Sequence, residues 1–144
     1  MATTEEQIRS IVENRISALR SKDARRFLSH MEGGFSSFEL GPPLQYLEND
    51  PSNTDGLDLW FSSFTGDVAY AIRDLRIVVG DPVSYCHSLY HIEGRKKDGE
   101  KVDMWTRQTL CFRRGTGGLK ISHSHLSVPF NMDGDHEAAL DLKP

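Results

Sequence analysis

Two histidines and an arginine in the C-terminal third have the types and spacing that could carry chemistry. Arg107 and Thr109 lie two residues apart in one predicted strand, and His123 and His125 lie two residues apart in the next. Because the side chains of a strand alternate between its faces, each pair shares one face of the sheet. The imidazoles could accept or donate a proton near neutral pH. The guanidinium could bind a carboxylate or stabilise an enolate.

The two histidines have two other interpretations. They could be structural, forming hydrogen bonds within a cavity and at its rim, or they could be two ligands of one metal ion. A zinc or iron site needs a third ligand, for which Glu39, His87 and His91 are candidates that their spacing does not distinguish. We therefore assign no metal. No Gly-rich phosphate loop joins a strand to a helix, so we expect no cofactor.

An arginine that faces an apolar interior needs a partner, because an unpaired buried charge is costly. For Arg107 the partner could be Glu39, Asp103 or an anionic ligand. Aromatic side chains could form the walls of the same site, although they could equally be ordinary core residues. The expected substrate-binding residues are Trp60, Phe64, Tyr90, Trp105 and Thr109.

The composition is that of a folded protein without surplus positive charge. Hydrophobic residues make up 38% of the 144 residues and charged residues 26%, which excludes a disordered chain. The formal net charge of −4 argues against a nucleic-acid partner. No apolar run approaches the roughly 20 residues of a membrane helix, and the polar N-terminus does not resemble a signal peptide. We therefore expect a cytoplasmic protein of one domain, residues 1–144, that has no membrane contact.

Apolar periodicity predicts helices in the first half of the chain and strands in the second. The expected helices are 3–21, 24–31 and 54–64, and the expected strands are 35–40, 68–79, 83–93, 102–114 and 119–128, with a polar loop over 44–54. Helices followed by an antiparallel meander favour an α+β fold, in which a curved sheet packs on three helices and encloses a pocket. Outer positions such as Leu110 and Phe112 would then need covering, which favours a homodimer through the outer sheet face.

Three segments, DGLDLWF, VDMWTRQTLCFRR and LKISHSHLSVPF, resemble the SnoaL-like, ketosteroid-isomerase-like branch of the nuclear transport factor 2-like superfamily. The resemblance covers nearly the whole chain and implies a cone-shaped, cystatin-like fold. It also implies that Glu39 is the general base. The isomerase oxyanion hole uses a tyrosine and a protonated aspartic acid. The matching positions here hold Arg15 and either Thr109 or Leu110, so this chain departs from the isomerase pattern.

These observations favour a cofactor-independent enzyme that acts by proton transfer, as an isomerase, dehydratase or cyclase does. Its substrate would be a small apolar molecule bearing a carbonyl, epoxide or carboxylate. Glu39 or the His123–His125 pair would move the proton, and Arg107 would stabilise the developing negative charge. The alternative is a non-catalytic module of the same fold that binds a small molecule or a protein partner.

Overall fold

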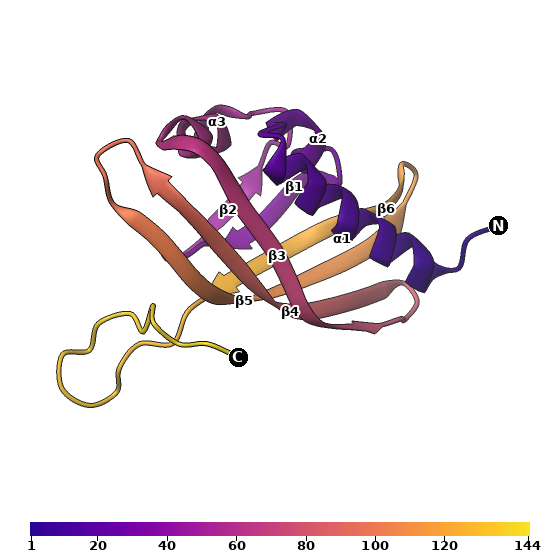
Figure 1. The fold of residues 1–144 in the computed structure, drawn as a ribbon. Helices are drawn as coiled ribbons and strands as arrows, with labels where there is room; N and C mark the ends of the chain where they lie inside the picture. The colour runs from indigo at the N-terminus through magenta and orange to yellow at the C-terminus, as the bar shows by residue number, and fades with distance from the viewer.

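A six-stranded sheet curls around one long helix in the computed structural model, which describes all 144 residues (Figure 1). The elements are α1 (Thr4–Arg20), α2 (Ala24–Leu28), β1 (Met31–Phe38), β2 (Tyr46–Asn49), α3 (Asp55–Ser62), β3 (Phe64–Val78), β4 (Val83–Lys96), β5 (Lys101–Gly115) and β6 (Gly118–Ser127). The strand order is β2-β1-β6-β5-β4-β3, and only β1 and β6 are parallel. The predicted α+β class and the mostly antiparallel meander are confirmed.

The first helix begins where the sequence predicts. Thr3 and Glu6 form a reciprocal capping box, with the Glu6 amide donating to Thr3 and the Thr3 amide donating to Glu6. The side chains of Ile8, Val12 and Leu19 then recur on one face and are buried against the sheet. No helix in the structure is long and apolar enough to cross a membrane.

Several predicted boundaries change where the chain enters the sheet. The second helix ends at Leu28 instead of residue 31, and Gly33 and Gly34 lie inside β1 instead of ending a helix. The pairing of β1 with β6 shifts register between Met31 and Ser36, which accommodates this segment. The expected polar loop over 44–54 contains the short strand β2, and Phe64 starts β3 instead of ending α3.

The core lies between α1 and the concave side of the sheet and divides into two clusters. One gathers around Phe61, Tyr70 and Tyr90, and the other around Ile8 and Phe112. Because directly opposed strand residues point to the same side, the inward positions of β5 are those that include Thr106, Gln108 and Leu110.

This register corrects one expectation. Leu110 is 2% exposed and Phe112 is 0% exposed, so both belong to the core and neither needs a partner to cover it. Arg107 and Thr109 alternate with them and therefore lie on the outer side of the sheet. The physical reason is that α1 packs its apolar face on the side that carries Leu110 and Phe112.

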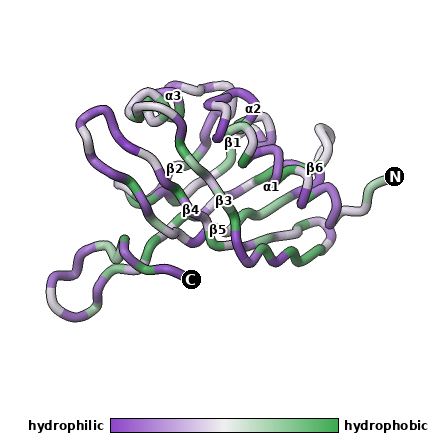
Figure 2. The backbone as a smooth tube through the Cα atoms, viewed as in Figure 1, coloured by the Kyte–Doolittle hydropathy of each residue, from purple (hydrophilic) through white to green (hydrophobic).

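Residues beyond β6 form an arm that stands away from the sheet (Figure 1). The arm folds back on itself through an antiparallel bridge between Phe130 and Ala138. Figure 2 shows that it carries both hydrophilic and hydrophobic residues. The arm is thus an ordered projection that adds little to the core.

Candidate functional site

The structure brings Arg107, Thr109, His123 and His125 together on one face of the sheet, as the alternation predicts. Thr109 pairs directly with His125, and Cys111 pairs with His123 on the same side. This face points away from α1, so these residues do not line the interior. We call it the outer face and define it by these four residues; Trp105 belongs to the same side.

The two histidines of the outer face are held by β1. The Nδ1 atom of His123 lies 2.6 Å from the hydroxyl of Ser36, and the Phe38 ring meets both imidazoles edge-on. The imidazole centroids are 6.5 Å apart. No third potential metal ligand gathers around them. The chain does hold three such residues elsewhere, because the ligand atoms of His91, Glu93 and Asp103 lie within 4.8 Å of one another.

Two members of that second group, His91 and Asp103, are joined by a hydrogen bond. The Nε2 atom of His91 lies 2.7 Å from Asp103, and the ring of His91 stacks on Trp105 with centroids 4.6 Å apart. The hydrogen bond from His91 holds the pKa of Asp103 below its ordinary value. A histidine that is already oriented by a carboxylate and an aromatic ring accounts for this cluster without an ion.

The interior contains one unexpected charge, Arg15. It lies on the buried face of α1 between Val12 and Leu19 and is 5% exposed. Its guanidinium carbon lies 4.1 Å from the centroid of the Phe27 ring. The Nε atom is buried without a hydrogen-bond partner, and Arg15 forms none of the ion pairs in the molecule. A buried cation without an acceptor is rare and needs an explanation.

Electrostatics around Arg15 reflect this burial. Loss of solvent lowers the pKa of Arg15 to about 10, although Tyr90, Cys86 and Glu39 oppose the shift. Burial also raises the pKa of Tyr90 and raises that of Cys86 to about 11, so both stay neutral near pH 7. The one formal negative charge among these contributions therefore comes from Glu39, which is exposed one residue beyond the end of β1.

Polar side chains separate the two apolar clusters. On β4, Ser88 lies between Cys86 of one cluster and Tyr90 of the other, and Gln108 is its direct partner on β5. On the neighbouring strands, Ser37 and Ser124 pair side by side. The Cys86 thiol and the Tyr90 phenol, on either side of this polar band, both contribute electrostatically to the pKa of Arg15. The interior thus combines a cation, hydroxyl groups and a phenol.

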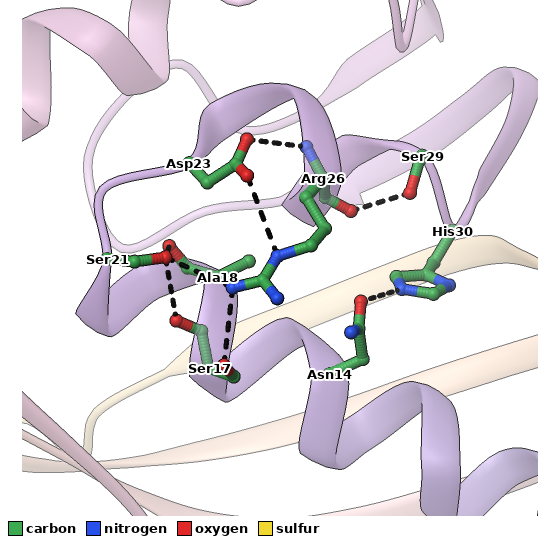
Figure 3. A network of polar contacts seen from close by, with 8 residues as sticks. All are labelled: Asn14, Ser17, Ala18, Ser21, Asp23, Arg26, Ser29 and His30. Carbon is green, nitrogen blue, oxygen red and sulfur yellow. Dashed lines mark hydrogen bonds and ion pairs between the residues drawn. The ribbon is translucent and has the colours of Figure 1, made fainter.

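A polar network at the end of α1 supports the same region (Figure 3). His30 lies 2.6 Å from the amide oxygen of Asn14, the residue before Arg15. Arg26 donates to the hydroxyls of Ser17 and Ser21. Burial is the main reason why the pKa of His30 is lowered, and the charge of Arg15 adds to it.

The remaining predicted residues divide between the two sides. Phe64 and Tyr90 are buried in the interior, and Trp60 packs beside them, its indole donating to the Tyr70 hydroxyl at 3.0 Å. Trp105 and Thr109 lie on the outer side. Two open surface hollows, lined mainly by residues near α2 and along the β3–β4 edge, contain none of the predicted site residues.

The sequence analysis found Arg15 at the position that matches the isomerase tyrosine but did not include it among the site residues. The signal was present in the pattern. An arginine interrupts the apolar face that Ile8, Val12 and Leu19 share, and a charge at such a position must face the interior.

Solved structures support the fold. A protein of unknown function from Pseudomonas putida KT2440, described as NTF2-like, is 24% identical with a TM-score of 0.84 and covers 100% of this chain and 99% of its own. A candidate dehydratase of the NTF2-like family from Streptomyces avermitilis is 16% identical with a TM-score of 0.70, covering 85% of this chain and 93% of its own.

A protein with a cystatin-like fold from Caulobacter vibrioides is 13% identical with a TM-score of 0.70, covering 88% of this chain and 89% of its own. No protein with a curated description matches the sequence significantly. The family model of the SnoaL-like domain matches residues 8–131. That match runs from Ile8, inside α1, to Asn131, beyond the end of β6, and confirms the predicted SnoaL-like resemblance. The chain belongs to the SnoaL-like family, and it has the fold of the NTF2-like solved structures.

Proposed function

We propose that this chain is a cofactor-independent enzyme that moves a proton on a small apolar substrate, with a carboxylate or carbonyl oxygen of the substrate held by Arg15. The observation that carries the proposal is the buried guanidinium without an acceptor. Burial of an unpaired charge costs several kcal/mol, roughly, and no carboxylate of the chain forms an ion pair with Arg15. A ligand anion would supply that compensation.

The groups around Arg15 suit proton abstraction next to a carbonyl. Removal of such a proton leaves an enolate, whose negative oxygen a guanidinium stabilises strongly where water is excluded. The phenol of Tyr90 is neutral and can donate a hydrogen bond to the same oxygen. Glu39 carries negative charge at the end of β1 and is the base that this scheme uses. Isomerases, dehydratases and cyclases share this first step.

The outer face supports this scheme less well. His123, His125 and Arg107 lie on the side of the sheet opposite Arg15, and none of them can meet a ligand bound there. Their catalytic roles stay predictions, and the experiments below separate them from those of Arg15 and Glu39. The candidate dehydratase of Streptomyces avermitilis has the same fold, which is compatible with this reaction class.

Binding is tested first, with Arg15→Met and Arg15→Lys. Aromatic and alicyclic monocarboxylates, each paired with its neutral amide, are titrated by calorimetry. A charge-assisted pair contributes about 1.5–3 kcal/mol, so Arg15→Met should weaken carboxylate binding by about 10- to 100-fold and leave the amides unchanged. Arg25→Met, an exposed arginine on α2, is the matched control. The proposal would be contradicted if the parent bound carboxylates no more tightly than their amides. It would also be contradicted if Arg15→Met bound carboxylates as tightly as the parent.

Stability provides a second readout. Removal of an uncompensated buried charge should raise the free energy of unfolding of the ligand-free protein by about 1–3 kcal/mol. A purely structural arginine would give the opposite sign. Arg15→Met that unfolds at lower denaturant concentration than the parent would therefore count against a ligand site.

Proton transfer is tested without knowing the natural reaction. A bound keto acid is incubated in D2O, and loss of the proton next to its carbonyl is followed by NMR. Glu39→Gln should slow exchange by about 10²–10⁴-fold while the Kd stays the same. His123→Gln should leave the rate unchanged. If His123→Gln loses exchange and Glu39→Gln does not, the catalytic residues lie on the outer face. If the keto acid binds tightly and no proton exchanges, the protein is the non-catalytic binding module.

A further inference from the structure

Gln108 is an inward-facing residue that the helices leave partly uncovered. It lies on the side of β5 that faces α1, between Thr106 and Leu110, which are 1% and 2% exposed. Because residues two positions apart in a strand share a face, all three side chains point to the same interior. Gln108 is nevertheless only half-buried. The layer of helices therefore leaves an opening over the middle of β5, between two positions that it covers completely.

The uncovered area extends to the neighbouring strand. On β6, Leu126 is the direct partner of Gln108, and Ser124 is the direct partner of Leu110. Directly opposed residues point to the same side of a sheet, so Leu126 and Ser124 also face the interior. Both are half-buried as well. A hollow over the middle of β5 and β6 accounts for the partial exposure of all three side chains.

The hollow lies where the two core clusters meet. On α1, Arg15 follows Val12 of one cluster and precedes Ile16 of the other. On β4, Ser88 likewise lies between members of the same two clusters, and it is the direct partner of Gln108. The boundary between the clusters thus carries one cation on the helix and two uncharged polar side chains on the sheet. Apolar side chains flank this boundary on both sides.

The hydrogen-bonding groups of Ser88 and Gln108 are not used within the chain. The side-chain hydrogen bonds on β4 and β5 involve other residues: Ser84, His91, Arg95, Lys96, Asp103, Thr106, Arg113 and Arg114. The Gln108 amide offers both a donor and an acceptor, and the Ser88 hydroxyl can act as either. Polar groups that face an interior are normally paired, so these two suit an uncharged polar group of a ligand.

We propose that the substrate is an apolar carboxylic acid that also bears a hydroxyl group, and that Gln108, with Ser88, selects it by binding this hydroxyl. This rests on the proposed function, which assigns the carboxylate to Arg15. A hydroxyl both donates and accepts, so it can satisfy the Gln108 amide oxygen and the Ser88 hydroxyl together. A keto group only accepts and would leave the amide oxygen unpaired. A second carboxylate would lose its water beside partners that carry no charge.

Calorimetry on the full chain tests the proposal with cyclohexanecarboxylate and its 3-hydroxy, 4-hydroxy and 4-oxo derivatives. The parent should bind at least one hydroxy acid about 3- to 10-fold more tightly than the unsubstituted and oxo acids, the effect of one neutral hydrogen bond. Gln108→Met keeps the length of the side chain without its amide and should abolish this preference. Ser88→Ala is the second variant and should reduce it. Gln45→Met makes the same change as Gln108→Met at an exposed position and should keep the preference.

Arg15→Met separates the role of Gln108 from the proposed function. Every probe carries the same carboxylate, so Arg15→Met should weaken all of them alike and keep the preference for the hydroxyl. If Arg15→Met weakens none of them, the proposed function is excluded. If it weakens all of them, yet the parent shows no hydroxyl preference or Gln108→Met retains it, only the role of Gln108 is excluded. A parent that binds none of the acids at millimolar concentration would overturn both.

The side-chain amide of Gln108 provides a direct readout. Its signals in a proton–nitrogen correlation spectrum are identified by their absence from Gln108→Met. They should shift on saturation with the preferred hydroxy acid and much less with the unsubstituted acid. Circular dichroism checks that every variant is folded. Gln108 signals that do not respond to the hydroxyl would overturn the proposal, because a purely structural side chain would behave in that way.

Discussion

At the scale of single residues, the proposed function makes Arg15 a position where stability and binding would oppose each other. Its guanidinium stacks on the Phe27 ring and is shielded from solvent, yet it forms no ion pair with a carboxylate of the chain. Such a group destabilises the empty protein and strengthens its preference for an anionic ligand, since both effects come from the same desolvated charge. This trade-off is common at sites that are organised before the ligand arrives.

His30 should make stability depend on pH in a defined direction. Burial lowers its pKa in the folded protein from the ordinary value of 6.5, and Arg15, Lys120 and Arg26 lower it further. The folded state therefore binds fewer protons than the unfolded state below about pH 6.5. This contribution to stability is present above that pH and is lost as the pH falls through the folded-state pKa.

Urea unfolding at pH 7.5 and pH 5 measures the effect. His30→Gln keeps a polar partner for Asn14 but cannot become charged, so it should lose less stability on acidification than the parent. His136→Gln, on the exposed arm, is the control and should follow the parent. Equal losses in His30→Gln and the parent would contradict the assignment.

At the scale of elements, β3 and β4 pack too closely at one point to accept a larger side chain. A Cβ atom at Gly94 of β4 would come within 3.0 Å of the Phe64 ring and 3.2 Å of Val68. Both residues belong to the core cluster around Tyr90 and cannot move freely.

Gly94→Ala should therefore lower the free energy of unfolding by about 1–3 kcal/mol, the usual cost of overpacking. Gly33→Ala, in β1, is the control because nothing lies within 4 Å of its added Cβ atom. Guanidinium unfolding at equilibrium measures both variants. If the two variants were equally stable, the Phe64 and Val68 side chains would be able to move aside for the added Cβ atom, and the contact between β3 and β4 would not be tightly packed.

At the scale of the whole molecule, the homodimer that the sequence analysis expects stays a proposal. If the proposed dimer forms, unfolding is coupled to dissociation, and the melting temperature should fall by roughly 2–4 °C for each tenfold dilution. Differential scanning fluorimetry from 1 to 100 µM checks this, and a parent chain that melts independently of concentration would contradict it.

The sequence by itself determined most of the helices and strands, though not all their boundaries, and the groups of residues that share a face. The capping box at Thr3, the apolar period of α1 and the alternation in β5 and β6 are local patterns, which short-range sterics and solvent exposure settle. For the same reason Arg107 and Thr109 were correctly grouped, as were His123 and His125. The predicted family was also confirmed, because its segments are contiguous in the chain.

Only the tertiary structure decided which side of the sheet is the interior. Alternation with a period of two assigns residues to two faces without saying which one a helix covers. Both faces of β5 carry apolar side chains, Trp105 on one and Leu110 and Phe112 on the other, so the pattern alone was ambiguous. Once α1 packs against Leu110 and Phe112, the histidines turn outward and Arg15 turns inward. The candidate site thus moved from the strands to the helix because burial depends on contacts between segments far apart in the chain.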